Sequence, residues 1–561
     1  MHARVFYVSN VSELNTSLMS VAAGDSVIIK NGIWQNTKII FYGNGTADKP
    51  IYLMAETPGN VMVTGASNLK IAGSYLVVEG LYFKDGYSPS GAVVEFRSDA
   101  GQESKNCRMT NCAIVNFNPS NDSTDYKWVS LYGSYNRVDH CYFKGKNHLG
   151  TTLVVWRPNN QANYHLIDHN YFANRPYLYG WNGAETIRVG TSDYSQSDSF
   201  TTVEYNYFEE CDGEIEAISN KSCGNIYRYN TFYKCAATLT LRHGNRCTVE
   251  GNYFIGAYKA NTGGVRIIGE DHKVFNNYFY QLSGSEFRSP ISIVNGIPNS
   301  PLSGYFQVKN SVVAFNTLID NKYSITIGAG KSSQQSLPPL NNVIANNIVK
   351  AGSTIIKYED TPINLTWQRN IMFGASLGIT NPGGIKIADP LLVLSDGSVY
   401  RLAQGSPAID SAQGSYTFVT DDIDGQPRGE NKDAGCDQLS QSAATRKRIG
   451  PDDVGVTWMN IITNVSSGKT KSAPKSFGLN QNYPNPFNPE TKISYYLTVS
   501  GIVNLCIYDL LGRKIDTLIN AEQSYGQHET SYNASALPSG IYFCKLEYGK
   551  NVSIIKMILL K

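Results

Sequence analysis

The chain has 561 residues, a formal net charge of +2 and only 17% charged residues, with 50 glycines and 37 tyrosines. This near-neutral balance excludes nucleic-acid binding through a global positive field, so any anionic partner must meet a local cluster of charges. No apolar run reaches the roughly 18 residues that a membrane-spanning helix needs. The composition is typical of an extracellular β-rich protein with more than one domain.

The N-terminal region, residues 1–45, precedes the first clear repeat. Its first residues lack the apolar core of a signal peptide. Residues 12–21, S-E-L-N-T-S-L-M-S-V, are a candidate for a short helix. We expect this helix to cap one end of the repeats, because an uncovered first coil would expose strand edges.

A three-residue motif then recurs: Asn or a substitute, any residue, and Phe or an aliphatic residue. Its copies start at Leu81, Cys112, Cys141, Asn170, Asn206, Asn230, Asn252, Asn277, Asn316, Asn347 and Asn370. They are 22 to 39 residues apart and are flanked by alternating apolar strands, with no competing helical pattern. This pattern predicts an all-β fold, a right-handed parallel β-helix, whose coils stack because none can bury its apolar face alone.

Two residue types are expected to hold the coils together. Asn at a repeated bend can form a hydrogen-bonded ladder that satisfies the backbone of the turns, and Phe two residues later fills the core. The longer intervals, 170 to 206 and 277 to 316, predict loops inserted on one face of the β-helix. Such loops usually form the binding cleft.

Four of the ten cysteines, Cys211, Cys223, Cys235 and Cys247, are spaced twelve residues apart. This spacing lacks the tight pairs that zinc sites use. If one coil takes about 24 residues, Cys211 stacks with Cys235 and Cys223 stacks with Cys247. We interpret these residues as two ladders of buried thiols, with disulfides between the coils as the alternative.

The central coils carry a cluster of charged residues. Glu214 and Glu216 are two residues apart, so on a β-strand they point to the same face, and Lys221 and Arg242 follow. Two carboxylates can hold a cation, while Lys and Arg can move protons or bind anions, which suits chemistry on an acidic sugar. Taken alone, such a Glu pair is more often a solvated strand face, and the two basic residues are more often surface charges.

The repeat fades in the last third of the chain. Residues 405–410 and 421–429, G-S-P-A-I-D and D-D-I-D-G-Q-P-R-G, are expected to close the β-helix. We therefore predict a β-helix domain with its cap over 1–440, a polar linker over 441–475 and a small C-terminal β-sandwich over 476–561. The sandwich is predicted from short alternating strands separated by turn signals.

The last module resembles the C-terminal sorting domain of the type nine secretion system. The matching segments are Q-N-Y-P-N-P-F-N-P-E-T-K-I (481–493), I-Y-D-L-L-G-R-K-I (507–515), L-P-S-G-I-Y (537–542) and the terminal K-M-I-L-L-K. The resemblance implies export across the outer membrane of a Bacteroidetes-type bacterium by the type nine machinery, to the cell surface or the medium. It also implies a signal peptide that this chain lacks. A carbohydrate-binding sandwich is the alternative.

The coil region, residues 5–435, resembles polysaccharide lyase family six, which includes alginate lyases and chondroitinase B. The matching segments are N-G-A-E-T-I-R-V-G (182–190), C-D-G-E-I-E-A-I-S-N-K-S (211–222), L-T-L-R-H-G-N (239–245) and G-G-V-R-I-I-G (263–269). The resemblance implies Ca²⁺ on Asn182, Glu214 and Glu216, with Lys221 as base and Arg242 as acid. It further places His243, Arg266 and Arg188 along a cleft that binds the acidic polysaccharide.

The expected function is calcium-assisted β-elimination at a uronate of alginate, which gives 4,5-unsaturated oligosaccharides. This reaction removes a proton next to a carboxylate, and calcium, which prefers oxygen ligands, would spread the charge that develops. A lyase of dermatan sulfate, similar to chondroitinase B, is the first alternative. A β-helix glycosidase would need clustered Asp residues, which the central coils lack, and a non-catalytic surface adhesin is the remaining alternative.

Overall fold

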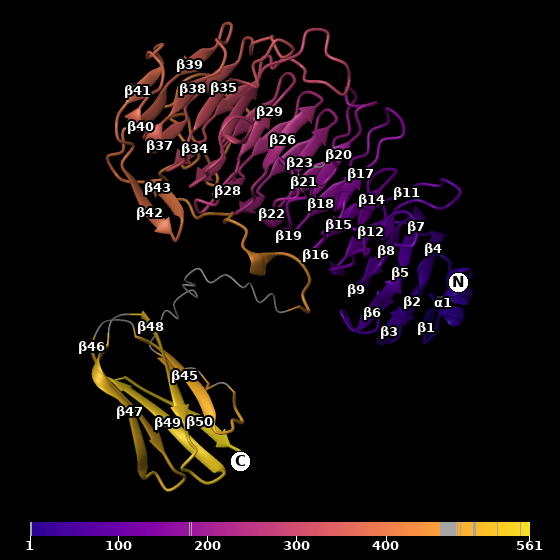
Figure 1. The fold of residues 1–561 in the computed structure, drawn as a ribbon, viewed down its shortest axis with the longest axis vertical. Coiled ribbons are helices and arrows are strands. Elements are labelled where there is room, and N and C mark those ends of the chain that lie inside the picture. Colours follow the sequence, from indigo (N-terminus) through magenta and orange to yellow (C-terminus); the bar gives the residue numbers. More distant parts are fainter. Residues whose placement is uncertain are drawn as a thin grey trace. The chain divides into compact units, whose positions relative to one another are not determined.

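The computed structural model describes residues 3–178, 180, 182–459, 478–479, 481–482, 484–497, 501–523, 526–549 and 551–561. The chain divides into two compact units, residues 1–461 and 462–561 (Figure 1). Among the described residues, no helix combines the length and apolar character that crossing a membrane requires.

The first unit is a parallel β-helix, as predicted, and nearly every coil contributes one strand to each of three long sheets (Figure 1). Sheet A contains, in order, β1 (Val5–Val8), β2 (Ser26–Ile29), β5 (Ile51–Ala55), β8 (Leu76–Glu79), β12 (Arg108–Thr110), β15 (Arg137–Asp139), β18 (Leu166–Asp168), β21 (Thr202–Glu204), β24 (Ile226–Arg228), β27 (Thr248–Glu250), β30 (Lys273–Phe275), β33 (Val312–Ala314), β36 (Val343–Ala345) and β39 (Thr366–Gln368). Sheet B contains β3 (Gly32–Gln35), β6 (Val61–Ala66), β9 (Leu81–Tyr87), β13 (Ala113–Val115), β16 (Tyr142–Lys144), β19 (Tyr171–Arg175), β22 (Tyr207–Cys211), β25 (Thr231–Tyr233), β28 (Tyr253–Ile255), β31 (Tyr278–Tyr280), β34 (Thr317–Ile319), β37 (Ile348–Thr354), β40 (Asn370–Ser376) and β41 (Ile385–Ile387). Sheet C contains β11 (Ser104–Lys105), β7 (Asn68–Ser74), β10 (Val94–Glu95), β14 (Val129–Leu131), β17 (Leu153–Val155), β20 (Ile187–Gly190), β23 (Glu216–Lys221), β26 (Thr238–His243), β29 (Val265–Ile267), β32 (Ile291–Val294), β35 (Ile325–Ala329) and β38 (Ile356–Tyr358), with β4 (Lys38–Asn44) also paired to β7.

The recurring Asn forms the predicted ladder at the bend between sheets A and B. Asn206 shows the pattern: its Oδ1 accepts from the backbone N–H of Asn170 at 2.9 Å, and its Nδ2 donates to the carbonyl of Ile167 at 2.9 Å. Its own backbone N–H donates to Oδ1 of Asn230 at 3.0 Å. Each Asn therefore satisfies backbone groups of a neighbouring coil that would otherwise be buried without a partner.

The Phe of the motif fills the interior, as predicted. Consecutive rings stack from coil to coil, with centroid separations of 5.0 Å for Phe172 and Phe208, 4.6 Å for Phe208 and Phe232, and 4.7 Å for Phe232 and Phe254. All ten cysteines of the chain are buried free thiols, which supports the thiol interpretation over disulfides.

The predicted N-terminal cap is the helix α1 (Val11–Leu18). Its first turn is capped by the side chain of Asn10, which accepts from the backbone N–H of Glu13 at 3.0 Å. Leu14 and Leu18 are buried against the first coils. A short 3₁₀ helix, η1 (Glu286–Arg288), lies in the loop before β32.

The segment after β41 differs from its predicted role, because it covers sheet B instead of only closing the last coil. After the hairpin of β42 (Leu392–Asp396) and β43 (Val399–Leu402), Ile423 and Cys436 pack on sheet B beside Tyr253. Further on, around η2 (Pro451–Asp453), Ile449 and Val454 pack against apolar side chains of β13, β16, β19 and β22. The outer face of sheet B is apolar enough to need this cover, whereas sheet C is left for the charged cluster.

Residues 441–459 of the predicted linker belong to this packed segment, and 460–477 lie outside the described residues. The predicted domain limits therefore stay a prediction. The second unit consists of two antiparallel sheets around one apolar core, which agrees with the predicted small β-sandwich. Its strands are β44 (Gly478–Leu479), β45 (Glu490–Leu497) and β48 (Gly526–Asn533) in one sheet, and β47 (Lys514–Gln523), β46 (Gly501–Tyr508), β49 (Gly540–Tyr548) and β50 (Asn551–Leu559) in the other.

The ladder makes a direct prediction for stability. Asn230→Ala removes the acceptor for the backbone N–H of Asn206 and the donor to the carbonyl of Val203. Each buried group left unpaired costs about 1–3 kcal/mol, so we expect about 2–5 kcal/mol less stability in chemical denaturation. Asn15→Ala, at an exposed position of α1, is the control and should change stability by less than about 0.5 kcal/mol. If the two substitutions lower stability equally, the Asn ladder does not contribute to stability as proposed.

Candidate active site

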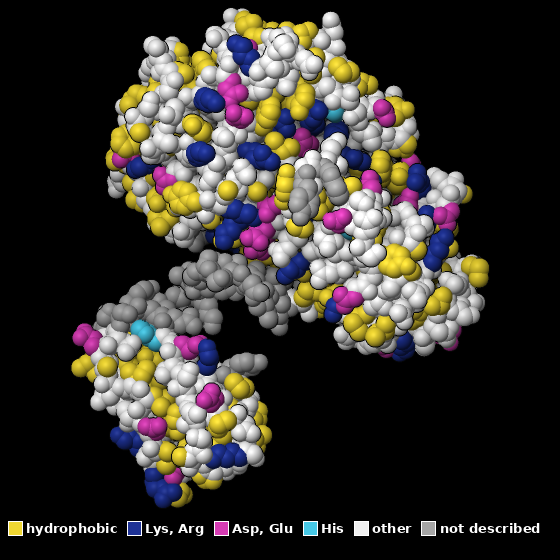
Figure 2. Space-filling model, viewed as in Figure 1, with side chains coloured by type: hydrophobic (Ala, Val, Ile, Leu, Met, Phe, Trp, Pro, Cys, Tyr) yellow, Lys and Arg dark blue, Asp and Glu magenta, His cyan; other side chains and the backbone are white. Residues whose placement is uncertain are grey.

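Sheet C brings residues from separate coils side by side on its outer face. In the strand register, Arg188 lies beside Ser219, Ser219 beside Thr240, and Thr240 beside Arg266. The strand positions between these residues point into the apolar core, so this row faces outward. Figure 2 shows basic, acidic and histidine side chains gathered on this face over β20, β23 and β26.

The two predicted carboxylates come together, but they do not share a strand. Glu216 begins β23, whereas Glu214 lies in the turn before it, so the expectation that both sit on one strand is wrong. The chain turns at Gly213, which packs against Ala184 so closely that a Cβ would lie 2.2 Å from the Ala184 carbonyl oxygen. The carboxylates still interact, because the charge of Glu216 acts on Glu214.

The turn that carries Asn182 lies against Glu214. The side chain of Asn182 is exposed, and the backbone N–H groups of Gly183 and Ala184 donate to Oε1 of Glu214 at 3.3 and 3.2 Å. The structure thus places the two residues after Asn182 against Glu214, although they belong to a different coil. The role of Asn182 as a ligand stays a prediction.

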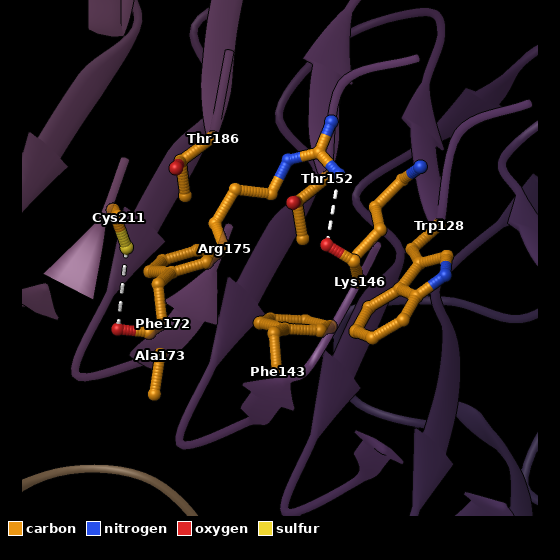
Figure 3. Close-up of a pocket in the computed structure, with 9 residues that line it drawn as sticks. All are labelled: Trp128, Phe143, Lys146, Thr152, Phe172, Ala173, Arg175, Thr186 and Cys211. Atoms are coloured by element: carbon orange, nitrogen blue, oxygen red, sulfur yellow. Dashed lines mark hydrogen bonds between the residues drawn. The ribbon is translucent and has the colours of Figure 1, made fainter. Parts of the chain in front are cut away.

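A buried arginine, Arg175, fixes this turn, and Figure 3 shows its guanidinium hydrogen-bonded to the carbonyl of Lys146. Arg175 ends β19 and is 2% exposed, and its Nε donates to the carbonyl of Ala184 at 3.2 Å. Its other nitrogens donate to the carbonyls of Lys146, His148 and Gly150 at 2.8–2.9 Å. These charge-assisted bonds hold the Ala184 peptide, and with it the amide that reaches Glu214, in one position.

Lys221 ends β23 beside the carboxylates. Its Nζ lies 3.9 Å from Oε1 of Glu185, and its side chain is largely buried. In the register of sheet C it lies opposite His243 on β26. The predicted base therefore lies on the sheet that carries Glu216 and next to the strand that carries Arg242.

Arg242 lies over Glu216 and is held by an inserted loop. Its Nε is 3.8 Å from Oε1 of Glu216. Nη1 donates to the carbonyl of Gly304 at 2.6 Å, and Nη2 donates to that of Ser303 at 3.2 Å. The guanidinium also stacks on the ring of Tyr305, 4.0 Å from its centroid. These contacts orient the predicted acid without neutralising it.

His243 is a neutral imidazole at this site. Burial, followed by the positive charges of Arg242 and Lys221, lowers the pKa of His243 to about 3. Its Nε2 lies between a donor, Nη1 of Arg242 at 2.8 Å, and an acceptor, the carbonyl oxygen of Gly304 at 3.1 Å. Its Nδ1 is buried and has no hydrogen-bond partner among the described residues, so this nitrogen is available to a ligand.

Two further arginines flank the cluster. Nη1 of Arg266 lies 3.5 Å from Oε1 of Glu216, and its Nη2 donates to the hydroxyl of Tyr305 at 3.1 Å. Arg188 stacks over Trp156 at 5.1 Å. In both arginines the Nε is buried without a hydrogen-bond partner among the described residues. Both retain a donor for an anionic ligand, and their role in substrate binding stays a prediction.

The electrostatics of the site depend on three carboxylates, because the charges of Glu185 and Glu216 both act on Glu214. Burial, then the charges of Glu185 and Glu216, raise the pKa of Glu214 to about 8, against the opposing effect of its two backbone hydrogen bonds. Three cations, Lys221, Arg242 and Arg266, face these carboxylates at 3.5–3.9 Å. These ion pairs are long, so the basic side chains only partly compensate the charge of the carboxylates.

The chemistry of the three predicted ligands suits a hard divalent cation. Asn182, Glu214 and Glu216 offer amide and carboxylate oxygens, which Ca²⁺ prefers. The charges of the carboxylates act on one another, and a divalent cation would relieve that repulsion. The donor set is short of protein ligands, which leaves positions for water and substrate.

Sequence reasoning missed two residues at this site. Glu185 falls inside the N-G-A-E-T-I-R-V-G segment, and its position three residues after Asn182 could have marked it as a site residue. Tyr305 lies in the long interval 277–316, for which an inserted loop was predicted without naming its residues. Both contribute contacts to predicted residues, Glu185 to Lys221 and Tyr305 to Arg242.

A second acidic cluster lies away from sheet C. Oxygen atoms of Asp422, Asp424 and Asp437 all come within 4.8 Å of one another in the segment that covers sheet B. Arg401 forms ion pairs with Asp424 at 2.7 Å and with Asp437 at 3.5 Å. The oxygens of Asp422 accept backbone amides, including that of Gln438 at 3.0 Å. These contacts account for the cluster as an internal ion-pair network.

The comparison with protein families decides the class of the first unit. Residues 8–396 match the family model of chondroitinase B. The chain belongs to this family, polysaccharide lyase family six. Among curated proteins, none matches the chain.

Solved structures of the same lyase family resemble the β-helix. The alginate lyase AlyGC is 36% identical with a TM-score of 0.71, and the match covers 81% of this chain and 59% of AlyGC. A mannuronic acid specific lyase from human gut microbiota is 32% identical with a TM-score of 0.62, covering 70% of this chain and 92% of that one. A lyase from Pseudopedobacter saltans is 28% identical with a TM-score of 0.58, covering 81% and 99%. The chain thus spans about three fifths of the length of AlyGC.

The C-terminal unit carries the export signal. Residues 481–561 match a secretion system C-terminal sorting domain, as the sequence resemblance implied. This domain marks the chain for type nine secretion to the cell surface or the medium.

The raised pKa of Glu214 predicts a pH-dependent stability. Between the ordinary pKa of 4.5 and about 8, the folded chain keeps a proton that the unfolded chain releases, so stability falls as pH rises through this window. In chelator, Glu214→Gln removes this penalty, and we expect it to raise the melting temperature by about 2 °C more at pH 9 than at pH 5.

The control for this prediction is Glu204→Gln, which breaks an ion pair with Arg228 on sheet A, outside the site. Its effect should not grow in the stabilising direction as pH rises. If Glu214→Gln shifts the melting temperature equally at the two pH values, the carboxyl of Glu214 does not titrate in this window.

Proposed function

We propose that this chain is a secreted lyase that cleaves alginate by β-elimination at a uronate, leaving a 4,5-unsaturated sugar. The observation that carries the proposal is the position of Lys221 beside Glu185 and of Arg242 beside Glu216, on neighbouring strands of sheet C. Membership of a polysaccharide lyase family supports the reaction class.

Charge balance explains why an acidic sugar suits this site. Three carboxyl groups accompany three cations, so the cluster itself is close to neutral once Glu214 is ionised. A bound divalent cation would make it net positive, and Arg188 adds a further charge on the same sheet. A uronate carboxylate would then meet a local positive field in a protein whose overall charge is near zero.

Asn182, Glu214 and Glu216 are the residues that would hold calcium. Bound there, calcium supplies positive charge against the uronate carboxylate, which lowers the cost of removing the neighbouring C5 proton. Glu214 offers its carboxylate from a turn fixed by the Ala184 amide and by Arg175, so its position does not depend on the cation.

The proton moves between the substrate and this chain's own groups. In its neutral form, Lys221 accepts the C5 proton through its Nζ, which lies 3.9 Å from Oε1 of Glu185. Arg242 donates hydrogen bonds to the departing C4 oxygen and stays charged, because guanidinium groups do not deprotonate in proteins, and water supplies the proton that completes the new hydroxyl. His243 cannot supply a proton as an imidazolium near neutral pH, because its pKa is about 3. Its Nδ1, which has no partner among the described residues, is available to hydrogen-bond the sugar.

Similarity to solved structures favours alginate as the proposed substrate. AlyGC is an alginate lyase and the gut enzyme is specific for mannuronic acid, and both share about a third of their residues with this chain. The family model that matches residues 8–396 is that of chondroitinase B, so dermatan sulfate is the second candidate.

The deciding experiment follows the ultraviolet absorbance of the unsaturated product on alginate and on dermatan sulfate in parallel. A rise on alginate alone is expected. A rise on dermatan sulfate alone would move the chain to the second candidate. Reducing ends without absorbance would indicate hydrolysis, and no product on either polymer would favour the adhesin.

Replacing the proposed base should abolish turnover without unfolding the chain. We expect Lys221→Ala to lower kcat on alginate by about 10²–10⁴-fold, because general-base help contributes that much. Lys234→Ala, which removes a lysine stacked on Tyr233 of sheet B, is the matched control and should keep wild-type kcat. Residual activity within tenfold of wild type would remove Lys221 from the role of base.

Removal of calcium tests whether alginate cleavage requires the cation. After exhaustive chelation we expect alginate cleavage to fall at least tenfold, since the carboxylate charge of the substrate is then left uncompensated. Added calcium should restore the rate, while added magnesium, which demands stricter geometry and keeps its water, should restore it poorly. Full activity in the chelated protein would show that elimination proceeds without the cation.

A further inference from the structure

The outer face of sheet C differs on the two sides of Lys221 and Arg242. Toward the C-terminus, at β29, β32 and β35, this face carries Ile268, Val294 and Ala329, which form an apolar cluster of their own, apart from the internal core. Each of the three is 0% exposed. Another part of the chain therefore covers this side of the sheet.

The cover comes from η1 and from the loop inserted between β32 and β33. Phe287 of η1, together with Tyr305 and Phe306 of the loop, packs against the apolar cluster. Phe287 reaches as far as β35, because a Cβ on Gly330, which directly follows that strand, would lie 2.4 Å from its ring. Aromatic side chains thus take the place of solvent over three successive strands.

This cover begins directly beside the proposed catalytic residues. Arg266 lies on β29, next to the strand of Arg242, and is only 2% exposed. Its guanidinium lies 4.3 Å from the ring centroid of Phe287, and its Nη2 donates to the hydroxyl of Tyr305 at 3.1 Å. The same loop reaches Arg242, whose Nη1 donates to the carbonyl of Gly304 at 2.6 Å. The cover therefore starts about 4.8 Å, one strand spacing, beyond Arg242.

Toward the N-terminus, the same face stays polar and open to solvent. Arg188 on β20 and Trp156, directly after β17, are both half-buried and stack on each other at 5.1 Å. Tyr132 continues the row, with its ring 5.9 Å from that of Trp156. Arg97 ends the row, 3.9 Å from the centroid of Tyr132, with 37% of its side chain exposed. A polymer can extend along this side of the site.

We infer that the cleft is closed at one end by Phe287, Tyr305 and Phe306, so that the enzyme removes short products from one end of the polymer instead of cutting within it. The inference rests on the proposed function. Cleavage of an internal bond needs room for the polymer on both sides of Lys221 and Arg242. The covered strands leave room only for a short end of the chain beyond Arg242.

The test follows the wild-type full chain on long alginate by two readouts. Ultraviolet absorbance counts the bonds cleaved, and viscosity reports the length of the remaining polymer. We expect absorbance to rise while viscosity changes little, with short unsaturated products in chromatography from the earliest time points. A steep loss of viscosity with the first bonds cleaved, or products of intermediate length, would overturn the inference.

Removing one ring of the cover should admit internal cleavage. Phe287→Ala exposes Arg266, and we expect the viscosity lost per bond cleaved to rise about threefold or more. This ratio does not depend on the overall rate, so a slower enzyme cannot mimic the effect. Phe200→Ala removes a ring stacked on Tyr164 before β21, and as the matched control it should keep the wild-type ratio. A Phe287→Ala protein that melts like wild type and keeps that ratio would overturn the role of the cover.

A second variant covers the case in which Phe287→Ala does not fold. Tyr305→Ala removes the other ring over Arg266, and we expect the same rise in viscosity lost per bond, even if kcat falls because Arg242 has lost a contact. An unchanged ratio in Tyr305→Ala would overturn the role of the cover.

The outcomes also separate this inference from the proposed function. If alginate yields absorbance together with a steep loss of viscosity, the proposed function holds and only the closed end fails. If dermatan sulfate is cleaved instead, the proposed substrate fails, and the same ratio on that polymer decides the inference. If neither polymer is cleaved, both fail.

Discussion

Parallel strand pairing in sheet C is the constraint on which the site depends. Neighbouring strands of a sheet lie about 4.8 Å apart, so residues separated by a whole coil of sequence become immediate neighbours. The register sets Lys221 opposite His243 and Ser219 opposite Thr240. A slip by one residue would turn outward side chains into the core. The Asn ladder at the bend between sheets A and B opposes such a slip, because each Asn binds backbone groups of an adjacent coil.

This framework lets the chain bury charge that the protein only partly compensates. Glu216 is shared between Arg242 and Arg266 at 3.8 and 3.5 Å, and Glu214 receives two backbone amides. Glu185 has one lysine at the limit of an ion pair. Unpartnered polar atoms gather around the same place, among them Nδ1 of His243. Groups that folding alone leaves unsatisfied are retained where a ligand completes them.

The sequence predicted most of the repeating architecture, because each rule acts locally and repeats. The Asn and Phe ladders, the cap α1 and the grouping of Lys221 with Arg242 followed from spacing and from family motifs. Prediction was weakest where the chain leaves the repeat. Glu214 was expected on a strand, but the contact between Gly213 and Ala184 makes a turn there. No periodicity shows that contact, since it joins two coils through an irregular turn.

The base and the proposed acid are positioned by different parts of the chain. Lys221 belongs to a coil, and strand pairing fixes its backbone. Arg242 also belongs to a coil, but its guanidinium is aimed by Ser303, Gly304 and Tyr305 of the loop inserted between β32 and β33. Loop length can change at low cost to stability, whereas coil register cannot. Changes in the length of the inserted loop can therefore alter how much of the polymer the site contacts. The sheet keeps the carboxylates and the lysine in place.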